Sequence, residues 1–504
     1  MKAHLSILLF IQISISALAV SQTTVIENTL RMAGKNRPQL QKVLDHYRSD
    51  SLKYRAACFL IENMDIHYSQ TYYWADSLNR KVSFNELDYS NYELSTFALE
   101  NLRKIIPGVH AVPVINRDVD VIKSDFLIKN IEAAFDSWKD RKGLPFSEFC
   151  EYLLPYRVAN EPLQDWREIY KENFGWIEDC VKINNAKSPS KYVLDYMLEK
   201  FKDTYNREKR IEPLPRLGAM QLLHRMKGPC EDIADMEIFI LRSQGYAASQ
   251  EIIPYWATTS GSHLLASVRV NDLQKHVSLE IANVDSLKDK QFWREPSKVI
   301  RSTYSKQPGV LAEFEAADQI PNNFMRLLNY KDVTSQYWPA KDLSCPLTHP
   351  VTKKIVYACV LNYQIWQPTW WAKTDGDSAT FTNMPKGVVY LPAYYENNKI
   401  IPAGFPVVLG YNHQEVLRPD TVNLRSVTIT QQEKYLKFRP YKQYKLMYWD
   451  KEWKVTGSKT TEEDTQELIF KDVPSNTLFI LIPEYSERKE RPFIITNQGE
   501  RVWF

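Results

Sequence analysis

The chain has 504 residues, of which 44% are hydrophobic and 25% charged, and its 64 basic and 61 acidic residues leave a net charge of +3. This near balance gives no electrostatic reason to expect nucleic acid or an anionic membrane as a partner. The length predicts about three or four domains of about 150 residues each. The low count of 15 glycines argues against long flexible linkers.

Residues 1–21 have the pattern of a signal peptide. Lys2 is followed by the apolar stretch Leu5–Ile15 and by the small-residue cleavage site Ala17-Leu18-Ala19, with Ser21 as a second cleavage candidate. An uncleaved anchor is the alternative, but the apolar stretch is short and contains a glutamine. We expect a soluble, exported protein, either periplasmic or at the cell surface or secreted. No later run approaches about 20 apolar residues, so no integral membrane segment is expected after signal removal.

Residues 22–200 are expected to form a helical N-terminal domain. Apolar residues recur at helical spacing over four stretches: Thr24–Met32, Leu40–Tyr54, Arg55–Met64 and Lys123–Asp140. The segment Phe149–Arg167 is different, because it combines two prolines, two arginines and several polar residues. It is expected to be a shaped loop between helices.

Residues 201–331 are expected to form an α+β core. A helix over Arg216–Met226 precedes Gly228-Pro229, and a second helix begins at Cys230 and ends at Gly245. Three strands are then predicted, at Ala247–Trp256, His263–Val270 and His276–Ile281. They should form an antiparallel sheet against the helix that begins at Cys230.

The remaining residues are expected to be all-β, with one sandwich domain over 332–420 and a second over 421–504. Short apolar runs alternate there with turn signals, and the break between the domains is placed in Val416–Asn423. The predicted strands are Val356–Tyr363, Asp377–Phe381, Gly387–Pro392, Phe405–Leu409, Val427–Ile429, Tyr444–Trp449, Glu467–Phe470 and Thr477–Pro483. The fold class predicted for the whole chain is α+β.

The six cysteines show no metal-binding spacing. They are Cys58, Cys150, Cys180, Cys230, Cys345 and Cys359. Most are expected to be small buried hydrophobic residues, and at least one is expected to be free. The histidines also lack ligand spacing, so neither a metal nor a cofactor is predicted.

Cys230, His263 and Glu280 follow one another in an order that indicates nucleophilic catalysis. A thiolate is favoured at a helix N-terminus, where backbone N–H groups and the helix dipole stabilise an anion. His263 would act as the base, and an acid should orient its ring. Glu280 is the first choice for that acid, and Asp285 is the competing one. The simpler alternative is a structural cysteine at a helix start.

Several segments resemble the transglutaminase-like superfamily. Gly228-Pro229-Cys230-Glu231-Asp232 is similar to the family's Gly-x-Cys-x-Asp segment, and Leu241–Tyr246 is similar to its helix end. Pro254-Tyr255-Trp256 and Gly261-Ser262-His263 match the strand and turn that bring in the histidine. Tyr156–Arg167 resembles a segment upstream of the core in exported bacterial members. The sequence departs from the family pattern after the histidine, where Leu264-Leu265-Ala266 follow, and in having Glu at the acid position.

The resemblance implies a papain-like core in which Cys230 attacks an amide carbonyl, His263 moves protons and Glu280 orients His263. The Cys230 backbone N–H would be one oxyanion donor, and the second is open between Gln221 and Trp166. Glu161 and Arg167 are candidates for lining the substrate cleft, with a structural salt bridge within the loop as the alternative. Trp166 and Trp256 complete the predicted binding residues.

Four aromatic residues between 363 and 371 suggest a second kind of site. Tyr363, Trp366, Trp370 and Trp371 would suit a sugar-stacking platform, although a role in the sandwich core and an interdomain contact is the simpler interpretation.

The function predicted from the sequence is a thiol-dependent amide hydrolase or acyl transferase. Its partner would be a peptide, a glycopeptide, a glycan or a cell-wall fragment, attacked through a thioester. The alternative is a catalytically inactive relative that recognises glycan or protein through its β domains. The oligomeric state is left open.

Overall fold

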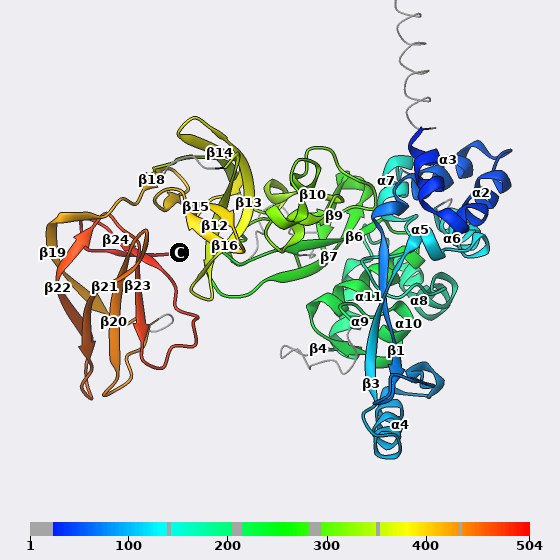
Figure 1. Cartoon of the computed structure of the whole chain (residues 1–504), viewed down its shortest axis with the longest axis horizontal. Helices are drawn as coiled ribbons and strands as arrows, with labels where there is room; N and C mark the ends of the chain where they lie inside the picture. The colour runs from blue at the N-terminus through cyan, green and yellow to red at the C-terminus, as the bar shows by residue number, and fades with distance from the viewer. Residues whose placement is uncertain (1–23, 139–142, 204–213, 282–293, 349–352, 433–435) are drawn as a thin grey trace, which may run out of the picture. The chain divides into compact units, whose positions relative to one another are not determined.

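The computed structural model describes residues 24–138, 143–203, 214–281, 294–348, 353–432 and 436–504 (Figure 1). The chain forms two compact units, each built from three segments. Unit 1 comprises Met1–Glu251, Leu264–Lys288 and Ser302–Gln307, and unit 2 comprises Ile252–His263, Asp289–Arg301 and Pro308–Phe504. The predicted signal peptide and Asp285 lie outside the described residues.

Helices dominate the first part of unit 1, as predicted. Residues 24–32 are helical, and four further helices follow in this part of the core: α2 (Arg37–His46), α3 (Ser51–Glu62), α6 (Ser124–Trp138) and α7 (Phe146–Tyr152). The prediction of one helix over Leu40–Tyr54 is wrong, because Asp50 begins a new helix. Its carboxylate accepts hydrogen bonds from the backbone N–H groups of Leu52 and Lys53.

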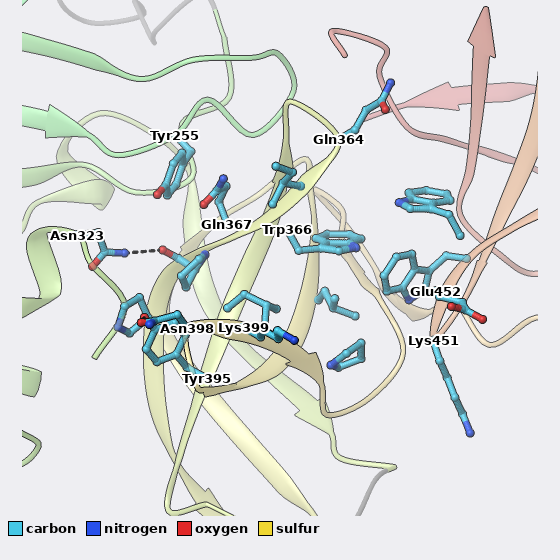
Figure 2. Close-up of a pocket in the computed structure, with 18 of the residues that line it drawn as sticks. Tyr255, Asn323, Gln364, Trp366, Gln367, Tyr395, Asn398, Lys399, Lys451 and Glu452 are labelled. Atoms are coloured by element: carbon cyan, nitrogen blue, oxygen red, sulfur yellow. Dashed lines mark hydrogen bonds between the residues drawn. The ribbon is translucent and has the colours of Figure 1, made fainter. Parts of the chain in front are cut away.

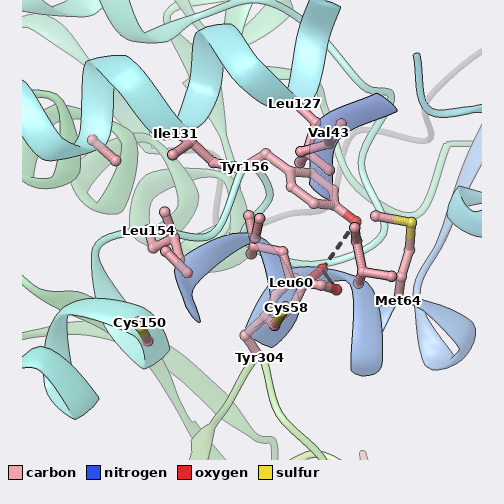
Figure 3. Close-up of a cluster of buried hydrophobic side chains, with 14 of the residues drawn as sticks. Val43, Cys58, Leu60, Met64, Leu127, Ile131, Cys150, Leu154, Tyr156 and Tyr304 are labelled. Carbon is pink, nitrogen blue, oxygen red and sulfur yellow. Dashed lines mark hydrogen bonds between the residues drawn. The ribbon is translucent and has the colours of Figure 1, made fainter. Parts of the chain in front are cut away.

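These helices enclose a buried hydrophobic core that Figure 3 shows in part. Val43, Leu60 and Ile131 are fully buried in it, and Tyr304 reaches it from a distant part of the chain. The Tyr304 hydroxyl donates to the Leu60 carbonyl (3.0 Å) and to the hydroxyl of Tyr156 (3.1 Å). These bonds satisfy polar groups that burial would otherwise leave unpaired.

The region expected to be helical also contains a small antiparallel sheet. Its order is β2 (Lys81–Val82), β1 (Tyr68–Ala75), β3 (His110–Arg117), and Tyr68 pairs with Arg117 at one end of the β1–β3 ladder. A helix, α4 (Tyr92–Ile105), and the one-turn helix α5 (Asp118–Val121) flank the last strand in sequence. Aromatic and β-branched residues such as those of Thr71–Trp74 favour strand formation, and this signal was missed.

The second part of unit 1 packs helices against strands. The helices are α8 (Arg167–Ile183), α9 (Ser190–Lys200), α10 (Ala219–Arg225) and α11 (Cys230–Ser243). The strands are β6 (Ala248–Ile253), whose last two residues belong to unit 2, β7 (His263–Val270), whose first residue belongs to unit 2, and β8 (Lys275–Ser278). In the sheet β6, β7 and β8 are neighbours in that order, and β7 and β8 are antiparallel. Buried residues of α11, including Ile238 and Phe239, share one core with Ala248 of β6 and Val268 of β7. A two-residue parallel pair, β4 (Lys202–Asp203) with β5 (Lys227–Gly228), leads into α11.

Helix α11 has the bounds predicted from the sequence. Pro229 precedes it, and Gly245 ends it with φ +84°, a left-handed conformation that favours glycine. The Gly245 N–H donates to the Arg242 carbonyl (3.1 Å) and the Tyr246 N–H to the Leu241 carbonyl (2.9 Å). This hydrogen-bond pair is the Schellman motif, which satisfies the last carbonyls of the helix.

Unit 2 begins its β region with one large antiparallel sheet. Its order is β11-β14-β13-β12-β15-β17-β18, and β16 pairs with β15 off this path. The strands are β11 (Ala340–Pro346), β12 (Ile355–Asn362), β13 (Ile365–Asp375), β14 (Ser378–Pro385), β15 (Val388–Glu396), β16 (Lys399–Pro402), β17 (Val407–Leu409) and β18 (Gln414–Val416). Both faces of β12 are buried, because Val356 and Tyr357 belong to different cores. Two short strands, β9 (Ile300–Ser302) and β10 (Tyr330–Asp332), pair with each other.

The C-terminal part consists of two further antiparallel sheets around a common core. One is β19-β22 and the other is β21-β20-β23-β24-β25. The strands are β19 (Asp420–Thr430), β20 (Gln443–Asp450), β21 (Glu452–Thr460), β22 (Glu467–Ser475), β23 (Phe479–Pro483), β24 (Phe493–Ile495) and β25 (Arg501–Trp503). Val427 and Phe470 from the first sheet pack with Tyr444 and Phe479 from the second. The predicted α+β class, with a helical N-terminal region and antiparallel sheets after it, is confirmed.

None of the helices within the described residues has the length and apolar character needed to cross a membrane.

Candidate functional site

Cys230 stands at the first position of α11 because of the two residues before it. At Gly228 the Asp232 carboxylate approaches so closely that a Cβ atom would overlap it, so the position requires glycine. Pro229 is the N-cap, and its carbonyl accepts from the N–H groups of Asp232 (2.9 Å) and Ile233 (3.1 Å). The restricted backbone of Gly228-Pro229 thus fixes where α11 begins and places the Cys230 thiol at its N-terminus.

Exposure distinguishes Cys230 from most of the other cysteines. All six are free, and four are buried, as predicted. Burial raises the pKa of the Cys58 thiol to about 11 and that of Cys150 to about 12, and it also raises the pKa values of Cys345 and Cys359. Only Cys180 and Cys230 are partly exposed, so these two are the thiols that a substrate or reagent can reach.

The Cys230 thiol has an acidic environment. Its Sγ donates a hydrogen bond to Glu231 Oε2 at 3.3 Å. Asp232 and Asp235, further along the same helix, are each 1% exposed. Asp235 lies 3.3 Å from Arg216 and also accepts a hydrogen bond from Gln250. Burial nevertheless raises the pKa of Asp235 to about 7, and the guanidinium of Arg216 only partly opposes this effect.

The predicted binding residues Glu161 and Trp166 both hold the loop that precedes α8. The Glu161 carboxylate accepts from the backbone N–H groups of Val158 and Ala159, each at 2.8 Å. Trp166 Nε1 donates to the Tyr156 carbonyl at 2.9 Å, so its single N–H is already used. Both side chains are 3% exposed. These contacts make the loop rigid, and substrate binding by Glu161 or Trp166 stays a prediction.

Arg167 is 5% exposed and serves the same loop. Its guanidinium donates to the carbonyls of Leu153, Leu154 and Pro155 and to the side chain of Asn130. Burial, together with the charge of Arg242, lowers its pKa to about 9. The described hydrogen bonds of Arg167 and Glu161 thus go to other groups rather than to each other. A role for Arg167 in lining a cleft also stays a prediction.

Arg242 connects the end of α11 to the same loop. It donates to the carbonyls of Tyr152 (2.9 Å), Arg157 (2.7 Å) and Ala248 (2.9 and 3.1 Å). The side chain is 4% exposed, and burial lowers its pKa to about 10. The arginine of the Leu-Arg segment is therefore a structural anchor for the helix that begins with Cys230.

His263 is the first residue of β7, and the turn before it is held by a residue that sequence reasoning missed. Asn362, buried at the end of β12, donates through Nδ2 to the carbonyls of Trp256 (3.1 Å), Thr259 (3.2 Å) and Gly261 (3.0 Å). Its Oδ1 accepts from the Gly261 N–H at 3.2 Å. One amide therefore fixes the turn before the predicted base.

The predicted binding residue Trp256 lies against His263. The two rings are 6.0 Å apart between centroids and nearly parallel, with an interplanar angle of 27°. Trp256 is 5% exposed and His263 is half-buried. The tryptophan therefore restricts the orientation of the imidazole, which is a positioning role in addition to the predicted binding role.

The three predicted catalytic residues are divided between the two units. Cys230 and Glu280 belong to unit 1, whereas His263 belongs to unit 2. Glu280 is exposed and lies in a 3-10 turn, η5 (Leu279–Ile281), which follows β8 directly. The triad and the choice between Glu280 and Asp285 therefore stay predictions.

Gln221, the other candidate for the second oxyanion donor, is buried at the start of α10. Its Oε1 accepts from the Gly218 N–H (2.9 Å), and its Nε2 donates to Glu86 (2.8 Å). Within the described part of the chain, no group of three His, Cys, Asp or Glu residues is placed to hold a metal ion.

Comparison with protein-family models, with curated proteins and with solved structures returns no match for the chain. The resemblance to the transglutaminase-like superfamily therefore rests on the residues of the chain alone.

Proposed function

We propose that the protein is an exported thiol-dependent amide hydrolase or acyl transferase with a papain-like, transglutaminase-like core. Its substrate would be a peptide, a glycopeptide or a cell-wall fragment. The observation that supports this proposal best is the position of Cys230, which is half-buried at the N-terminus of a helix whose core face packs against β6 and β7. Four of the other cysteines are buried.

In the proposed reaction His263 takes the proton of the Cys230 thiol, the sulfur adds to an amide carbonyl, and the C–N bond breaks as His263 passes that proton to the departing amine. Water then attacks the resulting thioester and gives a proton to His263; the C–S bond breaks, His263 returns the proton to the sulfur, and a carboxylic acid leaves. Glu280 orients His263 throughout. If an amine takes the place of water, the same intermediate yields acyl transfer.

Competitive alkylation tests whether Cys230 is activated. The full chain is treated with iodoacetamide at neutral pH, and the modification of Cys230 and Cys180 is followed by mass spectrometry of tryptic peptides. Cys180 is the matched control, because it is the other partly exposed thiol. We expect Cys230 to react at least about tenfold faster than Cys180, because the thiolate is the nucleophile. His263→Ala should remove that difference.

Product analysis tests the reaction itself. Wild type and Cys230→Ala are incubated with a panel of peptides, glycopeptides and muropeptides, and new carboxyl groups and amines are identified by mass spectrometry. Cleavage of at least one panel member by wild type and none by Cys230→Ala is expected. Equal alkylation of both thiols together with no Cys230-dependent product would refute the proposal.

A binding protein without catalysis is the second candidate function. It is favoured by an open groove in unit 2 that is lined by tryptophan, tyrosine and amide side chains. In that case the core around Cys230 would be a scaffold, and the β domains would recognise glycan or protein.

A further inference from the structure

The groove lies between the large sheet and the C-terminal sheets of unit 2 and has a volume of about 680 Å³. In Figure 2, Tyr255, Gln367 and Trp366 lie on one side, and Lys451 and Glu452 lie on the other. It is built from residues far apart in sequence, since Asn322 and Trp453 both line it. None of the residues considered for the thiol chemistry is among its lining residues.

Three tryptophans form a connected aromatic wall in the groove. Trp366 of β13 contacts Trp449 of β20 with ring centroids 5.3 Å apart, and Trp449 contacts Trp453 of β21 at 5.2 Å. Both contacts are edge-to-face, at 73° and 77°. Trp366 and Trp449 are 7% and 5% exposed, so they form the floor. Trp453 is partly exposed, as are Tyr395 and Tyr255 elsewhere in the lining, so a ligand can cover these rings.

The polar side chains of the groove offer both donors and acceptors. Gln367 makes no side-chain hydrogen bond within the described part of the chain, and neither does the amide nitrogen of Asn322 or Asn398. Lys399 and Lys451 are balanced in part by Glu452, and all three are exposed. The lining is therefore polar but carries little net charge, which does not favour a polyanion.

We propose that this groove binds a neutral oligosaccharide, with a sugar ring stacked on Trp453 and another on Tyr395. The apolar C–H face of a pyranose fits the electron-rich face of an aromatic ring. Each sugar hydroxyl both donates and accepts, and mixed amide, lysine and glutamate groups suit that property. The proposal does not depend on a reactive Cys230.

A proline-rich peptide is the main competing occupant, because such peptides also bind aromatic grooves. That mode uses indole or phenol donors toward peptide carbonyls. Here the Tyr395 hydroxyl already donates to Asn398 Oδ1 (2.8 Å). The indole nitrogens of Trp366 and Trp449 are buried, so a peptide carbonyl does not reach them. The two contacting tryptophan pairs meet edge to face, so neither pair forms a parallel slot for a proline ring. The geometry therefore favours a sugar.

Calorimetric titration of the full chain tests the proposal with cellohexaose, xylohexaose, mannohexaose, maltohexaose and hexa-N-acetylchitohexaose. We expect at least one to bind with a dissociation constant of about 1 mM or lower, and Trp453→Ala to weaken that binding at least about tenfold, which corresponds to about 1.4 kcal/mol. Tyr395→Ala is a second, independent variant, with the same expectation. Both side chains are partly exposed, and unchanged unfolding midpoints would show that the variants fold.

Tyr441→Ala is the matched control. Tyr441 is 66% exposed just before β20 but does not line the groove, so its variant should bind within about twofold of wild type. The proposal is overturned if no hexasaccharide binds, if Trp453→Ala and Tyr395→Ala bind like wild type, or if decaproline binds where the saccharides do not. Binding needs no thiol chemistry, so this outcome and that of the proposed hydrolase are independent.

Discussion

Replacing Arg242 with methionine should loosen the helix that presents Cys230. The substitution keeps a long apolar side chain but removes the guanidinium donors that bind the carbonyls of Tyr152, Arg157 and Ala248. Because Arg242 is buried, solvent does not replace these bonds freely. The loop that carries Arg157 would then lose its attachment to the end of α11.

Two opposing contributions determine the size of the effect. A buried carbonyl without a donor costs about 1–3 kcal/mol, which for three carbonyls is on the order of 6 kcal/mol. On the other side, the Arg242→Met variant no longer has to bury a charged guanidinium, and the absence of that desolvation cost raises its free energy of unfolding. Burial lowers the pKa of the guanidinium from 12.5 to about 10, a change worth about 3 kcal/mol. The free energy of unfolding of this region should therefore fall by about 3 kcal/mol.

Hydrogen exchange followed by mass spectrometry measures this locally in the full chain. A loss of about 3 kcal/mol corresponds to about a hundredfold faster exchange in peptides from the second half of α11 and from 152–157. Arg242→Lys, which keeps the charge but has one nitrogen, should fall between wild type and Arg242→Met. Arg48→Ala is the control, since it removes one exposed ion pair with Asp45 and should cost less than about 1 kcal/mol. Exchange within threefold of wild type in Arg242→Met would refute the reasoning.

Three further predictions concern polar groups described or implied above. The raised pKa of Asp235 means that the carboxyl stays protonated up to a pH of about 7 in the folded protein, whereas in the unfolded chain it ionises near 3.8. The free energy of unfolding of Asp235→Asn, measured in urea, should therefore rise by up to about 4 kcal/mol relative to that of wild type between pH 4 and pH 7. Parallel pH profiles of the two proteins would contradict this. Lys298 is fully buried in unit 2, where Nζ donates to Asp332 (2.6 Å) and to the carbonyls of Thr382 and Asn383. Lys298→Met should lower the free energy of unfolding by about 3 kcal/mol, because it leaves the Asp332 carboxylate without its cation. Adding Asp332→Asn should restore part of the loss in a double-mutant cycle. Asn362→Ala should speed backbone amide exchange over residues 256–262 and reduce any Cys230-dependent hydrolysis, while the alkylation of Cys180 stays unchanged. Unaltered exchange in that turn would show that the Asn362 side chain does not hold it.

The sequence predicted best those elements whose ends are fixed by local residues. Helix α11 was placed correctly because Pro229 begins it and Gly245 ends it, and β7 was placed correctly at His263–Val270. The split between α2 and α3 depends on the Asp50 cap, which an apolar pattern running through Leu40–Tyr54 conceals. The strands β1 and β3 lie among helices, and their aromatic and β-branched residues were outweighed by the surrounding helical pattern.

The site was less accessible to sequence reasoning, because its support comes from distant residues. Nothing near Asn362 indicates that it clamps the turn at Trp256–Gly261, about a hundred positions earlier in the chain. The predicted aromatic platform was wrong as a single surface: Trp366 alone lines the groove, whereas Trp370 contacts Lys298 and Trp371 contacts Phe314. The other tryptophans of the groove come from β20 and β21, and only the packing of two separate sheets brings them beside Trp366.

The Asn362 clamp has a practical consequence for anyone who wants to isolate the predicted catalytic core. A fragment ending near residue 331 contains Cys230, His263 and Glu280, yet it lacks the amide that holds the Trp256–Gly261 turn through four hydrogen bonds. The turn would then be free to reorganise, and His263 would start its strand from a different position. An inactive fragment would therefore say nothing about the activity of the intact protein, in which Asn362 of the β region holds the turn that precedes His263.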